Sequence, residues 1–265
     1  MGLSVGDEPR AVLRNREAFL RVLGFDVNDI VSSQQVHQDG VYVVLKGDRG
    51  RGATDRKTSI PSKDALITRE SRLPLMMYFA DCVPVFIFDL HCPAVGIVHS
   101  GREGTLRGVV LRAVEKMNAN FGSAPKDCHA AIGPSIRGCC YAVDDRIMDR
   151  AMAITDGGLS IHPLANAPGK YSLDLAEVNR LLLVKAGLPQ DHIHDIGLCT
   201  SCRQDLFYSH QRDVRHIKPR TMVAAEGEWA RIPSAHGPTA ESLNLQATGR
   251  MAGVVWIGEA DETGR

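Results

Sequence analysis

The stretch 83–121, VPVFIFDLHCPAVGIVHSGREGTLRGVVLRAVEKMNANF, contains the pattern that decides the fold. Residues 83–89 and 95–99 are apolar runs bounded by proline, glycine or aspartate, which is typical of buried strands. Residues 104–121 carry apolar side chains at helical spacing and stop before Gly122, a favourable residue for ending a helix. We therefore predict two neighbouring strands that can pair as a hairpin, followed by an amphipathic helix.

The rest of the chain continues this alternation of strands and helices. Helices are predicted at 11–23, 142–154 and 174–186, and strands at 41–45, 73–79, 129–132, 194–198 and 251–257. Because some successive strands are too close for crossover helices, the pattern favours a mixed-sheet α/β or α+β domain over a strict doubly wound one. The stretch 214–247 has little periodicity and is predicted to be a surface insertion.

The composition excludes several classes of protein. Among 265 residues, 31 Lys and Arg balance 31 Asp and Glu, so an electrostatic nucleic-acid binder is not expected. With 44% hydrophobic and 23% charged residues, the chain can fold around one large core. The apolar stretch 73–90 is interrupted by Pro74, Asp81 and Pro84, so we expect no membrane span. An odd number of cysteines, seven, and an opening without an apolar leader predict a cytoplasmic protein with free thiols.

Three segments each place a side chain that can bind a metal beside a turn. They are QQVHQDG with His37, YFADCVP with Cys82 and VGIVHSGREG with His99. Zinc accepts this mixture of imidazole and thiolate ligands. A hairpin of the two predicted strands would bring Cys82 and His99 to the same sheet edge. The spacing also fits a half-buried cysteine and two ordinary histidines, because free cysteine is among the most buried residue types.

The segment after His99 is a glycine-rich turn between a predicted strand and a predicted helix. Gly101 and Gly104 there could expose backbone N–H groups that favour an anion such as phosphate. The segment lacks the Lys-Ser/Thr pair of a P-loop and the spacing of the dinucleotide fingerprint, so a simple tight turn also fits it. Asp81 and Glu103 each neighbour a candidate ligand, and either could carry a proton, cap a helix or provide surface charge.

The remaining cysteine motifs are interpreted as structural. Cys199 and Cys202 form a CxxC pair, but no other ligand pair at a telling spacing accompanies them, so we expect structural thiols and no second metal site. Cys139 and Cys140 form a vicinal pair in a turn, where we expect them to pack around the start of the next helix.

Six motifs, in the same order along the chain, resemble those of the YfiH-like family. Members of this family are also described as laccase-domain proteins, purine nucleoside phosphorylases or peptidoglycan editing factor (PgeF). QVHQ at 35–38 approximates the family's QVHG, FADCVP at 79–84 its TADC-x-P, and HSGREG at 99–104 its HAGWRG. IGPSIRGCCYAV at 132–143 resembles IGP-x-I-x-x-CCYEV, LCTSCRQDLFYSHQRD at 198–213 resembles LCTYC-x-x-x-LFFSYRRD, and TGRMAGVVWI at 248–257 resembles the closing strand.

The resemblance, which covers nearly the whole chain, implies a fold and a site. The fold is α+β, a single αββα-layered domain with mixed sheets of the CNF/YfiH-like type, here over residues 1–265. The site is a zinc ion, with copper as the alternative, bound by His37, Cys82 and His99. Three protein ligands leave a fourth position open, as a catalytic zinc requires. We expect Cys82, His99 and the adjacent Asp81 to form the catalytic centre.

The resemblance also implies activity on purine nucleosides. The reactions are phosphorolysis of adenosine, inosine, guanosine or methylthioadenosine, and deamination of adenosine. The partners are then small-molecule nucleosides and phosphate, with no role for nucleic acid or membranes. Gly101, Arg102 and Gly104 are the expected phosphate-binding residues.

Two departures from the family pattern affect these expectations. The Trp-Arg of HAGWRG is replaced by Arg102-Glu103, which shifts the positive charge by one position and puts a carboxylate where a cation is usual. The first strand of the family, with its STR-x-GG-like segment, has no counterpart ahead of residue 9.

Three other functions are alternatives to activity on purine nucleosides. A copper-dependent, laccase-like polyphenol oxidase would need many histidine ligands, whereas the chain has ten histidines and one HxH pair. A hydrolase that edits peptidoglycan precursors would use Cys82 as its nucleophile. A degenerate, non-catalytic member would explain the missing first strand and the Arg102-Glu103 change. Metal content separates these possibilities.

Overall fold

The structure is a computed structural model that describes residues 1–3, 5–215 and 249–258. Six α-helices lie in this part of the chain: α1 (Pro9–Val22), α2 (Arg102–Leu106), α3 (Val109–Phe121), α4 (Asp145–Ile154), α5 (Leu175–Lys185) and α6 (His210–Asp213). None of them is both long enough and apolar enough to cross a membrane.

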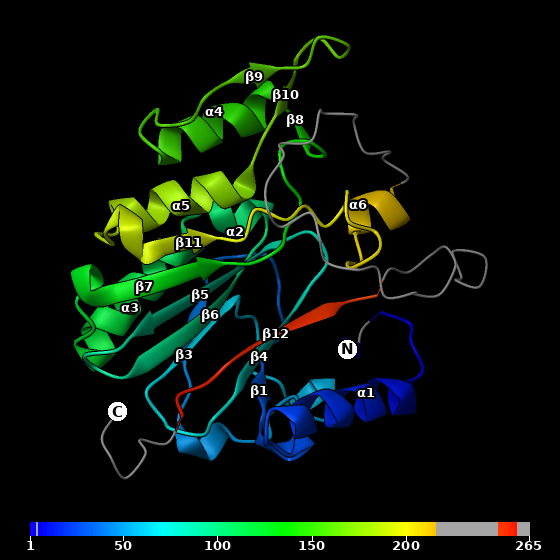
Figure 1. The fold of residues 1–265 in the computed structure, drawn as a ribbon, viewed down its shortest axis with the longest axis vertical. Helices are drawn as coiled ribbons and strands as arrows, with labels where there is room; N and C mark the ends of the chain where they lie inside the picture. Colours follow the sequence, from blue (N-terminus) through cyan, green and yellow to red (C-terminus); the bar gives the residue numbers. More distant parts are fainter. Residues whose placement is uncertain (4, 216–248, 259–265) are drawn as a thin grey trace.

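The strands of the described residues form three sheets (Figure 1). The largest has the order β11 (Ile193–Asp195), β7 (Cys128–Ile132), β5 (Val83–Asp89), β6 (Ala94–Ser100), β3 (Ala65–Thr68) and β2 (Val41–Val43). The second has the order β1 (Val31–Ser32), β4 (Leu75–Phe79) and β12 (Met251–Val255). The third has the order β8 (Ala142–Asp144), β10 (Lys170–Ser172) and β9 (His162–Pro163). The first two sheets contain both parallel and antiparallel pairs, so the mixed-sheet prediction is confirmed.

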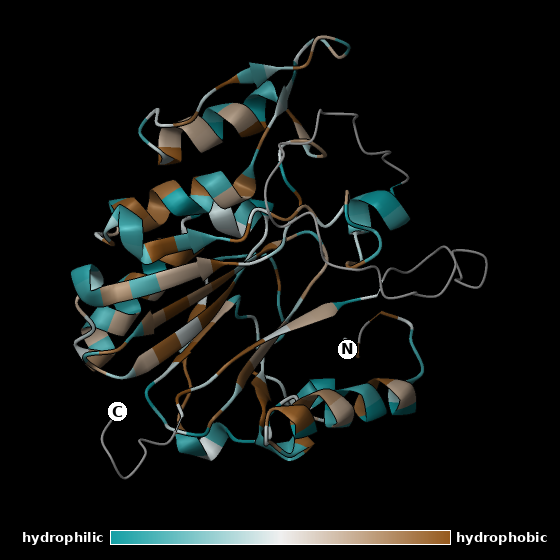
Figure 2. Cartoon of the chain, viewed as in Figure 1, coloured by the Kyte–Doolittle hydropathy of each residue, from teal (hydrophilic) through white to brown (hydrophobic). Residues whose placement is uncertain are grey.

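Three apolar cores separate four layers, in the order helix, sheet, sheet, helices (Figure 2). Strand β4 contributes side chains to two of these cores, because successive side chains of a strand point to opposite faces of its sheet. Met76 packs with Leu20 of α1, whereas Leu75 and Met77 pack against the large sheet. The other face of the large sheet packs against α3 and α5 in the third core. These layers match the α+β, αββα arrangement expected from the family resemblance.

The predicted hairpin forms and fixes two of the candidate ligands. Strands β5 and β6 pair antiparallel, with Pro84 opposite His99 and Val83 opposite Ser100. All seven residues of β6 are buried, which agrees with its continuous apolar sequence. Cys82 therefore lies at the same edge of the large sheet as His99.

Two predicted helices differ from the observed elements. The helix expected at 104–121 is two helices, α2 and α3, because Gly108 between them has a left-handed backbone with φ of 76°. The helix expected at 142–154 begins only at Asp145. Residues 142–144 pair with β10 as strand β8, and the Asp144 side chain then caps α4 by accepting a hydrogen bond from the Ile147 N–H (3.1 Å).

The other predicted elements occur at shifted boundaries, and several short strands were not predicted. Strand β3, ALIT, is buried on both faces, so it shows no alternation of polar and apolar residues. Strands β1, β8, β9 and β10 have two or three residues each, too few for a periodic signal. The surface insertion predicted at 214–247 lies almost entirely outside the described residues.

Candidate metal-binding active site

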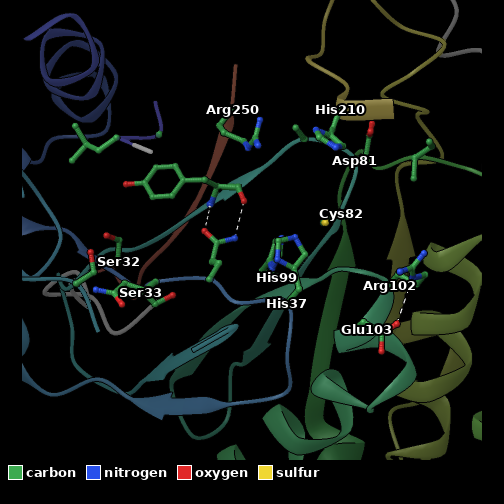
Figure 3. Close-up of a pocket in the computed structure, with 18 of the residues that line it drawn as sticks. Ser32, Ser33, His37, Asp81, Cys82, His99, Arg102, Glu103, His210 and Arg250 are labelled. Atoms are coloured by element: carbon green, nitrogen blue, oxygen red, sulfur yellow. Dashed lines mark hydrogen bonds and ion pairs between the residues drawn. The ribbon is translucent and has the colours of Figure 1, made fainter. Parts of the chain in front are cut away.

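A cavity of about 540 Å³ opens beside the turns that follow strands of the two larger sheets (Figure 3). Its volume is that of an ordinary small-molecule site. Six of the residues singled out from the sequence line it: His37, Asp81, Cys82, His99, Arg102 and Glu103. The structure thus brings together segments that are far apart in the sequence.

Three potential metal ligands meet in this cavity, and we call them the His–Cys–His triad (His37, Cys82 and His99). One ligand atom from each lies within 4.8 Å of the other two. The two imidazole rings are 4.8 Å apart between centroids and nearly perpendicular, at 83°. His99 is buried, Cys82 is half-buried and His37 is exposed, so the triad is open on one side.

Asp64 anchors two members of the triad, and sequence reasoning did not identify it. Its buried carboxylate accepts hydrogen bonds from the backbone N–H of Val36 (3.2 Å), His37 (3.0 Å) and Gln38 (2.8 Å). It also bonds Nδ1 of His99 at 2.8 Å, which leaves Nε2 of that ring for a metal. Asp64 precedes strand β3, so predicting that strand would have placed this acid at the sheet edge.

The backbone turn before Cys82 is held by Asp81, whose φ is 85°. One carboxylate oxygen of Asp81 accepts a hydrogen bond from Thr200 Oγ1 (2.6 Å), and the other accepts one from the Gln211 N–H (2.7 Å). Its carbonyl accepts from the Ile136 N–H (2.9 Å). Both oxygens of Asp81 therefore fix the turn that presents the Cys82 thiol.

Gly101 and Gly104 allow close packing behind the triad. A Cβ at Gly101 would lie 2.9 Å from the His37 ring and 3.1 Å from Cys82 Sγ. At Gly104 it would lie 2.8 Å from the carbonyl oxygen of Gln38. Neither glycine needs a left-handed backbone, so the requirement is space for the triad and for the loop that carries His37.

Arg102 and Glu103 lie side by side at the cavity wall (Figure 3). The Arg102 side chain is 46% exposed, and its Nε is 3.5 Å from a Glu103 oxygen. Glu103 forms a two-pronged ion pair with Arg150, at 3.2 and 2.9 Å. The hydrogen bonds from Arg150 lower the pKa of the Glu103 carboxyl. The carboxylate that departs from the family pattern is thus neutralised by Arg150.

The triad side chains shift one another's protonation in the metal-free chain. Burial alone would raise the pKa of Cys82, but the charge of His99 and hydrogen bonds from both histidines outweigh it and lower this pKa to about 6. Burial opposes the charged form of His99, yet the Cys82 thiolate and Asp64 raise its pKa to about 9. For Asp64, burial is opposed by the His99 and backbone hydrogen bonds, which bring the carboxyl pKa below its ordinary value. Cys82 therefore favours the thiolate, the form that binds metals.

The remaining cavity wall contains groups that stand in quoted motifs but were not predicted as site residues. The Gln35 side-chain amide donates a hydrogen bond to the Tyr78 carbonyl (2.8 Å) and accepts one from the Tyr78 N–H (2.9 Å). His210 and Arg250 point toward the cavity from segments far along the chain (Figure 3). The pairing of β12 with β4 and the hydrogen bond from the Gln211 N–H of α6 to Asp81 bring these segments to the site.

The expectation that no ligand pair accompanies Cys199 and Cys202 is wrong. The structure places Cys139 and Cys140 beside them, with one sulfur of each within 4.8 Å of the others. Sequence spacing could not reveal this, since Cys140 and Cys202 are 62 positions apart and a parallel bridge between Ser135 and Cys199 brings their turns together. We call this group the four-cysteine cluster (Cys139, Cys140, Cys199 and Cys202).

Comparison with protein-family models identifies the class of the protein. Residues 1–222 match the model described as "Multi-copper polyphenol oxidoreductase laccase". The chain therefore belongs to this laccase-domain, YfiH-like family, as its six motifs predicted. The family name refers to a metal, and the described residues contain two groups of side chains arranged as metal ligands, the triad and the four-cysteine cluster.

Individual relatives share most of the chain. Purine nucleoside phosphorylase YlmD of Geobacillus stearothermophilus is 40% identical over 213 residues, which are 80% of this chain and 78% of that protein. Adenosine deaminase RL5, from an unknown prokaryotic organism, is 32% identical over 209 residues, 78% of this chain and 79% of that one. The crystal structure of a Bacillus licheniformis hypothetical protein YfiH has a TM-score of 0.75 at 40% identity, covering 82% of this chain and 81% of the other.

Proposed function

We propose that this chain is a cytoplasmic, zinc-dependent purine nucleoside phosphorylase that also deaminates adenosine. Its substrates would be adenosine, inosine, guanosine and methylthioadenosine, with phosphate as the second substrate of phosphorolysis. The observation that carries the proposal is the His–Cys–His triad, with ligand atoms within 4.8 Å of one another in a cavity of about 540 Å³. The names of relatives that share about 80% of the chain support the reactions.

The chemistry of the triad fits zinc. Two imidazoles and one thiolate are ordinary zinc ligands, and three protein ligands are typical of a catalytic site. Asp64 holds His99 through Nδ1, the usual second contact of a metal-binding histidine. A zinc ion bound here would supply Lewis-acid chemistry at its open fourth position.

The residues around the triad can bind and orient the substrates. Ile136, Tyr141 and Leu175 form an apolar part of the cavity wall against which a purine base can pack. The Arg102 guanidinium offers charged donors for phosphate, while Arg150 holds the neighbouring Glu103. Phosphorolysis needs this phosphate beside the ribose C1′, whereas deamination needs water at the purine C6 and no phosphate.

Asp81 acts in this proposal as a positioning residue. Both of its carboxylate oxygens already accept hydrogen bonds, from Thr200 and Gln211. They hold the turn that directs Cys82 toward the two histidines. The catalytic groups that contact metal and substrate are then Cys82, His99 and His37, with Asp64 and Asp81 behind them.

One other function has a specific observation in its favour. In the metal-free chain Cys82, His99 and Asp64 form a thiol–imidazole–carboxylate series, and the pKa of Cys82 is lowered to about 6. A hydrolase that edits peptidoglycan precursors could use such a thiolate as its nucleophile. Zinc would block that nucleophile, so metal dependence separates the two functions. Copper-dependent polyphenol oxidation would need many more histidine ligands than the triad offers.

The test measures both purine reactions on the full chain with defined metal content. Hypoxanthine release from inosine is followed with and without phosphate, beside inosine formation from adenosine. We expect phosphate-dependent hypoxanthine release and deamination, both lost after chelation and restored by zinc. Cys82→Ser should lack both reactions, and Cys92→Ser, which changes an exposed cysteine outside the triad and the cluster, should keep them. Activity that survives chelation, or that only copper restores, contradicts the proposal.

A further inference from the structure

The four-cysteine cluster lies apart from the triad, and the proposed reactions make no use of it. Cys139 and Cys140 belong to the turn before β8, and Cys199 and Cys202 to the turn that follows β11. Cys202 Sγ is 3.6 Å from Cys139 Sγ and 3.4 Å from Cys140 Sγ. All four cysteines are free.

The sulfur positions fit one small metal ion. Four thiolates about 2.3 Å from a tetrahedral zinc lie about 3.8 Å from one another. The separations of Cys202 Sγ from the other two sulfurs, 3.4 and 3.6 Å, are close to that value, and all pairs lie within 4.8 Å. Cys202 is about equally far from Cys139 and Cys140, which suits a shared centre better than one sulfur–sulfur pair.

The backbone around the cluster has the form of a preorganised ligand loop. The Arg203 N–H donates to the Cys199 carbonyl at 3.0 Å and closes the CxxC turn. The Cys140 N–H donates to the Arg137 carbonyl at 2.9 Å and closes the other turn. These two backbone hydrogen bonds fix the turns that carry the four sulfurs.

The cluster also has an entry side. Cys140 and Cys199 are buried, Cys139 is half-buried and Cys202 is exposed. A metal ion can reach the sulfurs from the side of Cys202, and water there can solvate the charge of a metal bound by four thiolates. This burial pattern differs from that of inert core cysteines such as Cys128, whose thiol pKa burial raises to about 12.

We propose that the four-cysteine cluster binds a second metal ion, a single Zn²⁺ in closed tetrahedral coordination with a structural role. Tetrahedral coordination by four sulfurs selects zinc or iron among the common metals, and a closed set of four cysteines without added sulfide is a common structural zinc site. The chain supplies all four ligands, so no position remains for a substrate.

The position of the cluster defines what this zinc would stabilise. The turn at 199–202 carries Thr200, whose hydroxyl bonds the Asp81 carboxylate, and the turn at 137–140 follows Ile136, whose N–H bonds the Asp81 carbonyl. A metal that joins the two turns holds Asp81 from both sides. Through Asp81 it would hold the turn that directs Cys82 toward the two histidines. The metal of the cluster would take no part in the reaction.

Metal stoichiometry tests the proposal without reference to activity. Elemental analysis of the full chain, purified with reductant, should give about two zinc ions per chain. Cys199→Ser combined with Cys202→Ser, and separately Cys139→Ser combined with Cys140→Ser, should each remove about one zinc. His37→Ala combined with His99→Ala should remove the other, and Cys92→Ser should remove none. One zinc in the parent, unchanged in both cluster variants, would overturn the proposal.

Two measurements on the parent protein cover the case in which a cluster variant does not fold. Zinc-edge X-ray absorption should show a first shell richer in sulfur than in nitrogen, because the cluster adds four sulfurs to the single sulfur of the triad. Zinc in the triad alone would give more nitrogen than sulfur. Peptide mass spectrometry of protein purified without reductant, then denatured with a chelator and alkylated, should find the four thiols free. A nitrogen-rich shell, a second metal that is iron or copper, or a disulfide within the cluster overturns the proposal.

Discussion

The His–Cys–His triad and the four-cysteine cluster differ in how much of a metal's surroundings the chain supplies. The triad offers three ligand atoms beside a cavity of about 540 Å³ and is open at His37. The cluster offers four sulfurs, and none of its four cysteines lines that cavity. Three ligands with an open position suit catalysis, and four suit a structural role.

The supporting contacts of the two groups differ in the same way. Behind the triad, a buried carboxylate orients the ligands, since Asp64 bonds both His99 and the backbone of His37. Behind the cluster, backbone hydrogen bonds close the two turns, from the Arg203 N–H to the Cys199 carbonyl and from the Cys140 N–H to the Arg137 carbonyl. Asp81 connects the two regions through Thr200 and Ile136. Changes at the triad should therefore affect chemistry strongly, and changes at the cluster should affect it weakly.

Replacing the sulfur of the triad should have the largest effect. Cys82→Ser removes the thiolate ligand, and losing Lewis-acid stabilisation worth several kcal/mol predicts at least a ~10³-fold fall in kcat/KM for both purine reactions. Zinc content should fall by about one ion per chain, and the melting temperature should stay close to that of the parent. Steady-state kinetics and elemental analysis check this result. Retained activity with a full metal complement would show that Cys82 is not a ligand.

Weakening the support behind the triad should have the next largest effect. The two carboxylate oxygens of Asp64 accept four hydrogen bonds, and Asp64→Asn replaces one of these oxygens with an NH₂ group. His99 and the loop of His37 then lose part of their orientation. Changes of this kind lower metal affinity or activity about tenfold to a hundredfold. Zinc competition with a chromophoric chelator measures the affinity. Asp48→Asn is the matched control, since Asp48 is a buried acid away from the cavity, and this change should lower stability with zinc affinity unchanged.

Arg102→Ala should separate the two reactions at the triad. A charge-assisted contact with phosphate is worth roughly 1.5 to 3 kcal/mol, so phosphorolysis of inosine should fall about tenfold to a hundredfold. Deamination of adenosine uses no phosphate and should stay within a few-fold of the parent. Arg49→Ala, which breaks the surface pair with Asp29, should leave both rates unchanged. Equal losses of both reactions would point to general damage near His99 and against a phosphate-specific role.

The pH dependence of thiol alkylation should differ between Cys82 and the buried Cys128. In metal-free protein the pKa of Cys82 is about 6, so its thiolate fraction and its alkylation rate should rise about tenfold between pH 5 and 7. The increase has this sign because the reactive thiolate forms as pH rises through the pKa. Cys128, with a thiol pKa of about 12, should stay unmodified throughout. Peptide mass spectrometry after timed alkylation gives both rates, and added zinc should protect Cys82. A Cys82 rate that only rises above pH 8 would contradict the described charge pairing.

Changes at the four-cysteine cluster should have the smallest effect on turnover. Cys199→Ser combined with Cys202→Ser leaves the triad ligands in place, so kcat for both reactions should stay within a few-fold of the parent. Kinetics at 25 °C together with thermal unfolding should show a loss of stability larger than the loss of turnover. A collapse of kcat equal to that of Cys82→Ser would contradict the separation of a catalytic and a structural group.

The central part of the fold was predictable because its signals are local. The run 83–99 has two apolar segments with a short connection, and β5 and β6 form at nearly the predicted boundaries. The break between α2 and α3 was missed because Gly108 inside a helical pattern indicates a left-handed break only when its φ is known. Strand β3 was missed because burial on both faces removes the alternation that marks a strand.

The candidate site was partly predictable for a similar reason. Each triad member stands in a motif beside a strand end, and pairing of Pro84 with His99 follows from the hairpin. Asp64 has no motif of its own and becomes visible only through the hydrogen bonds it accepts. The four-cysteine cluster depends on the bridge of Ser135 with Cys199, a tertiary contact that no local pattern encodes.

Anomalous diffraction at the zinc edge, on crystals of the reduced full chain, tests the central claim most directly. The account predicts a peak about 2.0 to 2.1 Å from a nitrogen of His37 and from Nε2 of His99, and about 2.3 Å from Cys82 Sγ. Zinc chemistry at the triad requires this peak, whatever the cluster contains. A map without density between these three side chains, in protein that carries out both purine reactions, would contradict the account.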